Sequence, residues 1–308
     1  MSVLSPDPAG KTLSFASCVP CQLVHRRAVA EVLITDWRAA GPTAFECAAQ
    51  WPRGHRLYRV HEGRHDPLLV AETLRQAGIM LCHVAYDIPP DHSFLMDRLA
   101  FEVDPAGLEA GSTPADVVVR IDVTEGRRTK AQTSIRFDME FLRDGRAVAR
   151  GIGVVRCVAP SLYRRLRAQA ARPGTQPPDT PDPVAAPRVG LIDPGDVVIG
   201  RQRQPGVWPV RVPVEHPVLF DHPLDHVPGM LVFEALRQAA RDRLGWAHAQ
   251  PLSADLTFGR FLELTDGCSV REDVSGTGAG RATLAVSAEQ TGAAAAEGTM
   301  TLAEHLGV

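Results

Sequence analysis

Two long apolar segments that share one set of polar residues constrain the fold of this chain most strongly. Residues 65–86 align with residues 227–248 at an offset of 162 positions, and the hexapeptides ETLRQA and EALRQA coincide at five of six positions. Each segment is apolar on almost every face apart from a few polar residues, which is typical of a buried helix. The repetition predicts an internal duplication. The shared polar residues are Glu72 and Glu234, Arg75 and Arg237, and Gln76 and Gln238.

Runs rich in β-branched residues and bounded by Gly, Pro or Asp accompany each helix and predict strands. The Asp-Gly pair within RDGR at 143–146, between two such runs, predicts a hairpin. An antiparallel sheet wrapped around one buried helix is the hotdog architecture, so the sequence predicts an α+β double hotdog. The expected strands are 30–37, 94–103, 116–123, 133–142 and 147–158 in the first half, and 207–214, 254–264, 268–274, 281–289 and 296–304 in the second.

A proline-rich segment divides the chain. Residues 172–188 contain six prolines in 17 residues and no apolar periodicity, which predicts an extended linker. We therefore expect an N-terminal hotdog domain over 1–171 and a C-terminal one over 189–308. The length of 308 residues agrees with two domains at roughly 100–200 residues each.

Composition narrows the classes of function. The net charge of −3 gives no global reason to bind nucleic acid, and no basic helix-turn-helix pattern is present. No apolar run approaches the ~20 residues that span a bilayer, and the start of the sequence lacks a signal pattern, so we expect a cytoplasmic protein without membrane contact. The six cysteines are too irregular for a disulfide framework, and the CxxC of Cys18 and Cys21 has no second CxxC to complete a zinc site. We expect no metal and no cofactor.

The buried Glu and Arg of each helix have two interpretations. A buried carboxylate and guanidinium cost several kcal/mol unless they are paired or used. At spacing i and i+3 they can form a salt bridge on one helix face. Recurrence of the same polar set in both halves favours a functional role over a purely structural bridge.

The approach to the second helix, residues 220–230, concentrates polar side chains before Pro228 and Gly229. The backbone N–H groups of Gly229 and Met230 at the helix start are suited to hold the carbonyl oxygen of a thioester. In the first half the equivalent stretch contains His65, followed by Asp66 and Pro67. The side chains of the second approach that are suited to orient a substrate are His222, Asp225 and His226.

These residues resemble the AfsA-like family, the A-factor-type γ-butyrolactone autoregulator synthases, which consist of two hotdog repeats. The resemblance rests on VHRRAVAEVLITDW at 24–37, HDPLLVAETLRQAG at 65–78 and FDHPLDHVPGMLVFEALRQAA at 220–240. It implies an acyltransferase that joins a β-ketoacyl group, carried by an acyl carrier protein, to the hydroxyl of dihydroxyacetone phosphate. The product would then lead to a signalling butyrolactone.

Transesterification needs a base, an oxyanion site and a cation for the phosphate. We assign Glu234 as the base and Arg237 as the phosphate ligand, because the planar guanidinium suits phosphate oxygens. Glu72 and Arg75 form the parallel catalytic set, and the sequence leaves open which half works. Gln238 and Gln76 belong to the same sets and are assigned to substrate binding.

Two other classes of function remain. One is a hotdog dehydratase or thioesterase that acts on acyl thioesters without a second substrate. The dehydratase spacing from histidine to helix is not reproduced at His222, which is followed by Pro-Leu-Asp. The other is a non-catalytic acyl-binding module in which the polar helix residues only fix the ligand.

Overall fold

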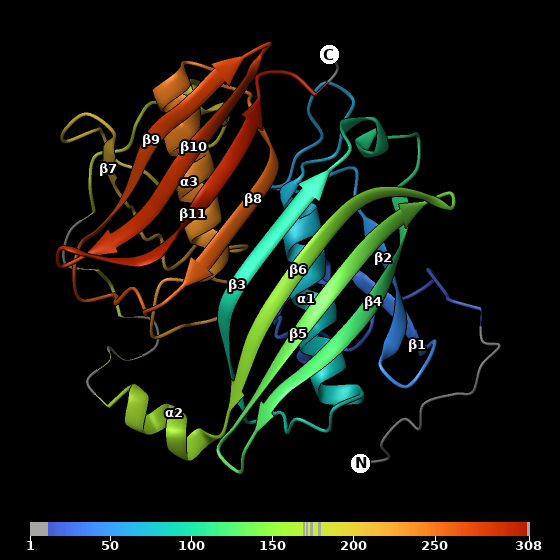
Figure 1. Cartoon of the computed structure of the whole chain (residues 1–308). Coiled ribbons are helices and arrows are strands. Elements are labelled where there is room, and N and C mark those ends of the chain that lie inside the picture. Colours follow the sequence, from blue (N-terminus) through green and yellow to red (C-terminus); the bar gives the residue numbers. More distant parts are fainter. Residues whose placement is uncertain (1–11, 169, 171, 173–174, 178–179, 307–308) are drawn as a thin grey trace. The chain divides into compact units, whose positions relative to one another are not determined.

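The computed structural model describes residues 12–168, 170, 172, 175–177 and 180–306. The chain divides into two compact units, Met1–Ala168 and Gln169–Val308. Each unit contains one long helix packed against an antiparallel sheet (Figure 1). The predicted combination of a buried helix with an antiparallel sheet is therefore present in both halves of the sequence.

In the first unit, helix α1 (Leu68–Val84) packs against a sheet with the strand order β1–β2–β4–β5–β6–β3. Neighbouring strands in this order are antiparallel. A short helix, α2 (Pro160–Leu166), follows the last strand of the unit. The strands are β1 (Ile34–Ala39), β2 (Ala44–Trp51), β3 (Ser93–Val103), β4 (Ala115–Arg128), β5 (Gln132–Arg143) and β6 (Arg146–Val158).

In the second unit, helix α3 (Gly229–Leu244) packs against a sheet with the order β8–β11–β10–β9–β7. Its neighbouring strands are also antiparallel. The strands are β7 (Val207–Pro209), β8 (Gln250–Phe258), β9 (Cys268–Gly278), β10 (Arg281–Gln290) and β11 (Ala293–Ala303).

Most expected strands lie within a few residues of those observed, with three differences. Strand β2 (Ala44–Trp51) was not predicted, because its FECAAQW sequence has few β-branched residues. The strand expected over 207–214 ends at Pro209. Val210 then forms an isolated bridge with Ile199, and its N–H donates to the Cys268 carbonyl at 2.8 Å. The strand expected over 254–264 ends at Phe258. The hairpin is confirmed: Asp144 and Gly145 connect β5 to β6 with φ angles of 49° and 76°.

Two glycines on β6, Gly151 and Gly153, let α1 lie close to the sheet. A Cβ at Gly151 would come within 2.4 Å of the Leu74 side chain, and one at Gly153 within 2.8 Å. Leu74 occupies the space that these two glycines leave open. A larger residue at either position would therefore push the helix away from the strand.

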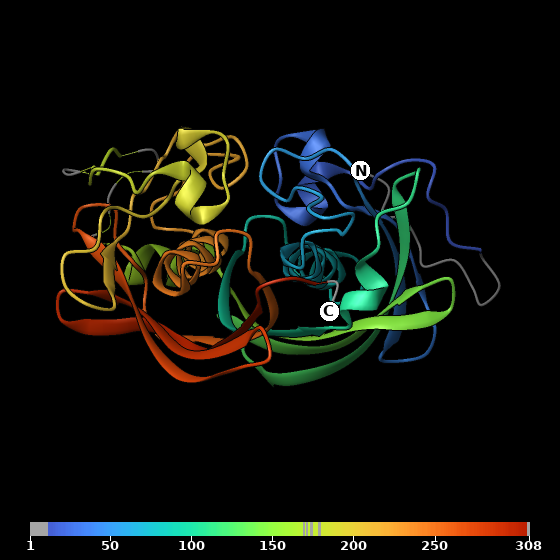
Figure 2. The same cartoon turned by 90° about the horizontal axis from the view of Figure 1, so that it is seen from above.

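A third layer of short turns covers the side of each helix that faces away from the sheet (Figure 2). This layer explains why both helices are apolar on nearly every face, since sheet and turns together leave little of the helix in contact with solvent. The turns of this layer are 3-10 helices: η1 (Cys21–Val24) and η2 (Val29–Glu31) in the first unit, and η4 (Ala186–Val189) and η5 (Pro194–Asp196) in the second. A further 3-10 helix, η3 (Pro105–Leu108), belongs to the first unit but not to this layer.

The proposed linker over 172–188 falls partly outside the described residues, at 173–174 and 178–179. Its C-terminal end packs within the second unit: Val184 and Ala186 are buried, and Ala186 begins η4. The domain limits at 171 and 189 stay a prediction.

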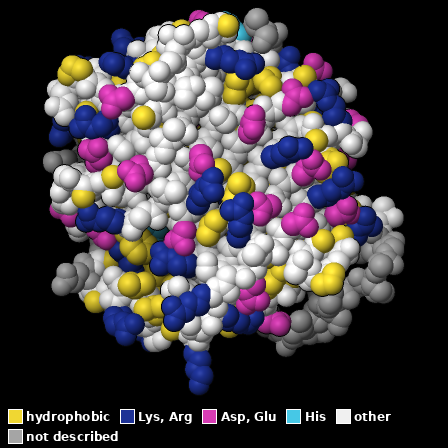
Figure 3. Space-filling model, viewed as in Figure 1, with side chains coloured by type: hydrophobic (Ala, Val, Ile, Leu, Met, Phe, Trp, Pro, Cys, Tyr) yellow, Lys and Arg dark blue, Asp and Glu magenta, His cyan; other side chains and the backbone are white. Residues whose placement is uncertain are grey.

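Basic and acidic side chains are interspersed over the molecular surface seen in Figure 3. Many form pairs along the sheets, such as Arg136 with Asp138 at 2.6 Å and Arg156 with Asp97 at 2.7 Å. The positive charge of these arginines is therefore neutralised locally. Among the helices of the described ranges, none is long and apolar enough to cross a bilayer.

Candidate functional site

Helix α3 brings Glu234, Arg237 and Gln238 together, as the i, i+3, i+4 spacing predicts. Arg237 Nη2 lies 2.5 Å from one carboxylate oxygen of Glu234, and Gln238 Nε2 donates to the other at 2.7 Å. Glu234 is fully buried and Arg237 is 1% exposed. Arg237 also reaches Gln250 at 3.4 Å. The expected phosphate ligand is thus held inside the unit as the partner of Glu234.

Helix α1 carries the corresponding group with one addition that the sequence did not reveal. Glu72 accepts hydrogen bonds from Arg75 and Gln76, and also from Arg26, whose Nη2 lies 2.7 Å away. Burial alone would raise the pKa of Glu72, but Arg26 and Arg75 outweigh it and lower this pKa to about 2. A carboxylate held by two guanidinium groups is a poor proton acceptor. Arg26 lies within the segment 24–37 that carries the family resemblance, and this was the only signal for it.

The two glutamines hold the backbone of the turns beside each helix, and their role in substrate binding stays a prediction. Gln238 Nε2 donates to the Asp196 carbonyl at 2.9 Å, and its Oε1 accepts from the Val198 N–H at 2.9 Å. Gln76 makes the same contacts with the Glu31 carbonyl and the Leu33 N–H, both at 2.8 Å. With its second amide hydrogen on the carboxylate of Glu72 or Glu234, each side chain has no donor left for a ligand.

The starts of the two helices differ. In α1 the Asp66 carboxylate accepts from the Leu68 N–H at 2.9 Å and closes the helix start. Helix α3 begins at Gly229 after Pro228, without a side-chain cap. Among the described residues, the N–H groups of Gly229 and Met230 have no hydrogen-bond partner. The predicted oxyanion donors are therefore open in the second unit only.

The approach to α3 holds an oriented histidine. His226 Nδ1 lies 2.6 Å from Asp225 Oδ1, so Nδ1 carries the proton and Nε2 keeps its lone pair. The ring stands edge-on to Phe261 and its side chain is 25% exposed. His222 contacts Asp221 at 3.4 Å. The sequence His226-Val227-Pro228-Gly229 has the form His-x-Pro-Gly, so the expectation that the dehydratase spacing from histidine to helix is absent, which was based on His222, is wrong.

His65, the first-half counterpart, is enclosed. Its ring is fully buried beside Trp51, and neither ring nitrogen has a hydrogen-bond partner among the described residues. Burial, assisted by Arg143, lowers the pKa of His65 to about 4, so the ring is neutral at pH 7. Its role in substrate binding stays a prediction.

Glu272 on β9 is a buried carboxyl outside this constellation. It is fully buried, and within the described part of the chain neither of its oxygens has a hydrogen-bond partner. Burial raises the pKa of Glu272 well above its ordinary value, against a smaller opposing effect of Arg243. The folded protein therefore binds a proton that the unfolded chain releases, and stability falls as pH rises above about 4.5.

Replacement of Glu272 by glutamine is expected to remove this pH dependence. The neutral side chain carries no protonation cost, so the variant should gain melting temperature relative to the parent at pH 8 and show no such gain at pH 4. Melting curves at both pH values measure the effect. Asp273→Asn, one residue further on the exposed face, is the control and should be neutral; equal shifts at both pH values for Glu272→Gln would contradict the assignment.

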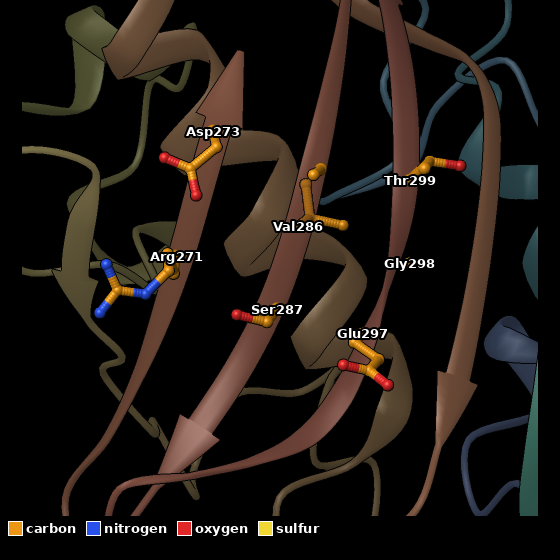
Figure 4. A pocket seen from close by; sticks show the side chains of 8 residues that line it. Arg271, Asp273, Val286, Ser287, Glu297, Gly298 and Thr299 are labelled. Carbon is orange, nitrogen blue, oxygen red and sulfur yellow. The ribbon is translucent and has the colours of Figure 1, made fainter. Parts of the chain in front are cut away.

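A shallow hollow of about 380 Å³ lies on the face of the second-unit sheet that points away from α3. Its lining includes Arg271 and Asp273 from β9 and Glu297 from β11 (Figure 4). These side chains alternate with buried neighbours that face the helix, so the hollow is separate from Glu234. Over the described ranges no three His, Cys, Asp or Glu side chains converge as metal ligands.

The sequence is similar to known proteins over most of its length. The sequence profile of the A-factor biosynthesis hotdog domain, AfsA, matches residues 10–159 and 174–303. A "2-oxo-3-(phosphooxy)propyl 3-oxoalkanoate synthase" of Streptomyces virginiae is 36% identical over 259 residues, which cover 83% of this chain and 87% of the relative. The protein of that name from Streptomyces coelicolor is 36% identical over 277 residues, 89% of this chain and 88% of the relative.

The likeness extends to a solved structure. The 12:0-ACP thioesterase from Umbellularia californica superposes with a TM-score of 0.51 over 85% of this chain and 97% of that chain, at 11% identity. At this identity the match shows a shared fold alone. The profile accounts for both halves of the sequence, and the chain is a double hotdog that belongs to the AfsA family of A-factor biosynthesis.

Proposed function

We propose that this chain transfers a 3-oxoacyl group from an acyl carrier protein to the free hydroxyl of dihydroxyacetone phosphate, and that the reaction takes place in the second unit. The names of its relatives describe a 3-oxoalkanoate ester of a phosphooxypropyl group, which is the product of such a transfer. A family match does not say which half works. That choice rests on the contrast between the two helix starts.

The open start of α3 is the observation that carries the proposal. The thioester carbonyl needs N–H donors for the charge that develops on its oxygen. Gly229 and Met230 offer them, whereas Asp66 occupies the equivalent place in α1. The first unit also binds Glu72 with two guanidinium groups and encloses His65. The first unit is the scaffold and the second carries the chemistry.

Glu234 acts as the general base in this scheme. It takes the proton from the acceptor hydroxyl, the hydroxyl oxygen bonds to the thioester carbon, and the C–S bond breaks as the proton passes to the carrier thiol. Because Glu234 is fully buried, bulk water does not surround it, which favours transfer to a bound alcohol over hydrolysis. Arg237 holds the carboxylate, and His226, oriented by Asp225, contacts the acceptor.

A competing assignment gives the proton to His226, whose Nε2 is free to accept it. The two assignments differ in the effect of substitution. If Glu234 is the base, His226→Gln reduces transfer less than Glu234→Gln does. The reverse order would move the base to His226 and leave the overall reaction unchanged.

The function is tested by incubating the purified protein with a 3-oxoacyl thioester of acyl carrier protein and dihydroxyacetone phosphate. Mass spectrometry should show the phosphorylated ester and free carrier thiol in equal amounts. Thioester consumption at the same rate with water alone would support a thioesterase. Loss of water from a 3-hydroxyacyl thioester would support a dehydratase, and binding without turnover an acyl-binding module.

The acceptor is expected to need its phosphate. A charge-assisted contact to phosphate contributes about 1.5–3 kcal/mol, which corresponds to roughly 10–150-fold in kcat/KM. Dihydroxyacetone without phosphate should therefore be a poorer acceptor by at least about tenfold. Equal kcat/KM values for the two acceptors in a steady-state assay would show that the site does not recognise phosphate.

A further inference from the structure

A buried histidine–carboxylate pair lies in the second unit, next to the Gln238 side chain that contacts Glu234. His216 Nε2 lies 3.1 Å from Asp196 Oδ1, and both residues are 3% exposed. On the other side of the ring, Nδ1 accepts hydrogen bonds from the N–H groups of Val218 at 3.2 Å and Leu219 at 3.1 Å. Because Nδ1 accepts twice, the ring proton is on Nε2 and is donated to Asp196.

The first unit contains the same arrangement. His55 Nε2 lies 3.3 Å from Glu31 Oε2, and its Nδ1 accepts from the N–H groups of Leu57 at 3.1 Å and Tyr58 at 2.9 Å. The pair has therefore been duplicated together with the helix and its polar residues. None of these histidine and carboxylate side chains was predicted from the sequence to have a role.

In the second unit the pair connects to the proposed base through Gln238. The Asp196 carbonyl accepts from Gln238 Nε2, and the same amide group donates to Glu234. Two sets of hydrogen bonds thus meet at Asp196: its side chain binds His216, and its backbone carbonyl binds Gln238, which in turn donates to the Glu234 carboxylate. A displacement of Asp196 shifts the Gln238 amide that fixes one oxygen of Glu234.

His216 also fixes the entry to the substrate side. The Phe220 N–H donates to the His216 carbonyl at 2.9 Å, and the chain continues directly into the 221–226 stretch that carries His222 and His226. The His216 side chain therefore ties Asp196 to the 218–219 turn, whereas the contact with Phe220 is made by the backbone and is kept when the side chain is replaced.

We propose that His216 and Asp196 are positioning residues for acyl transfer, which act through Gln238 on Glu234 and do not touch the substrate. The inference rests on the proposed function. Its physical basis is that a base must be held within a fraction of an ångström of its productive place, and a displacement of about 1 Å can cost about 10²-fold in rate.

The duplicated pair supplies a matched control inside the same chain. His55 makes the same kind of contacts in the unit that we regard as scaffold. If the pair only stabilises the fold, substitutions at 55 and 216 have the same consequence: a lower melting temperature and unchanged kcat per folded molecule. If it positions the base, only the substitution at 216 lowers kcat.

The experiment uses two substitutions that separate the nitrogens of the ring. His216→Asn keeps an acceptor for the Val218 and Leu219 N–H groups but removes the donor to Asp196. His216→Gln keeps a donor that reaches Asp196 and removes the acceptor. His55→Asn is the control, and kcat and acceptor KM are measured on the intact chain with carrier-bound thioester, with folding checked by circular dichroism.

We expect His216→Asn to lower kcat by up to about 10²-fold with KM for the acceptor unchanged, because the residue acts on the base and not on binding. His216→Gln should recover most of this loss, and His55→Asn should keep the parent kcat. Equal effects of His216→Asn and His55→Asn on kcat, or no recovery in His216→Gln, would overturn the proposal.

Measurement of Glu234→Gln in the same assay separates the proposed function from the positioning role of His216. An inactive Glu234→Gln together with a fully active His216→Asn overturns the positioning role and leaves the proposed function intact. A fully active Glu234→Gln removes the role of Glu234 as base, and the positioning inference falls with it. Low kcat in both single variants, with no further loss in the double variant, supports both.

Discussion

Glu234→Gln is expected to lower the rate of acyl transfer by about 10²–10⁴-fold, which is the usual contribution of a positioned general base. Glutamine keeps the volume and accepts or donates hydrogen bonds, but it cannot take the proton of the acceptor hydroxyl. The variant also deprives Arg237 of its ion pair, so some loss of stability accompanies the loss of activity. Activity is therefore compared per folded molecule, well below the melting temperature.

Glu72→Gln is the matched control for this prediction. It removes a buried carboxylate from the corresponding place on α1 and breaks the ion pairs with Arg26 and Arg75. Its transfer rate per folded molecule should equal that of the parent. Normal activity in Glu234→Gln would reduce the α3 pair to a structural salt bridge, and a loss at both positions would mean that both units take part in catalysis.

The largest expected effect on stability comes from Glu72 itself. Loss of one partner of a buried pair costs about 3–5 kcal/mol, because it leaves an uncompensated charge in the interior. Glu72 serves two guanidinium groups, and Arg26 is only 8% exposed. Glu72→Gln should therefore lower the free energy of unfolding, measured in urea, by an amount in this range.

A double substitution tests the origin of that cost. Glu72→Met combined with Arg26→Met removes both the carboxylate and the more buried cation, so it should cost less than Glu72→Met alone. The side chain of Arg75 is 16% exposed and retains partial contact with water. If the two single substitutions add up to the double one, the ion pair is not the source of the stability.

Apolar periodicity and short-range spacing predicted the main elements of the fold. The repeated pattern around Glu72 and Glu234 identified both buried helices and brought Glu, Arg and Gln onto one face of each. The Asp-Gly pair at 144–145 predicted the β5–β6 hairpin through its need for positive φ. These features depend on residues that are close in sequence, where helix and turn geometry leave few alternatives.

Contacts between distant residues were not predictable in the same way. Arg26 is separated by 46 residues from Glu72, and Asp196 by 20 from His216. Neither pair shows a periodicity, because Arg26, between η1 and η2, and Asp196, at the end of η5, are placed only when the third layer packs on the helices. The difference between the helix starts had a local signal, since Asp66 stands before Pro67 where Val227 stands before Pro228. The sequence alone did not show that the Asp66 carboxylate accepts a hydrogen bond from the Leu68 N–H and so caps α1.

The capped start of α1 has a consequence for the stoichiometry of the molecule. Two hotdogs in one chain would suggest two equivalents of acyl thioester per polypeptide. Because Asp66 occupies the start of α1 and the start of α3 has no side-chain cap, the proposed function implies a capacity of one equivalent per chain. On that proposal, gene duplication has doubled the architecture without doubling the number of reaction centres.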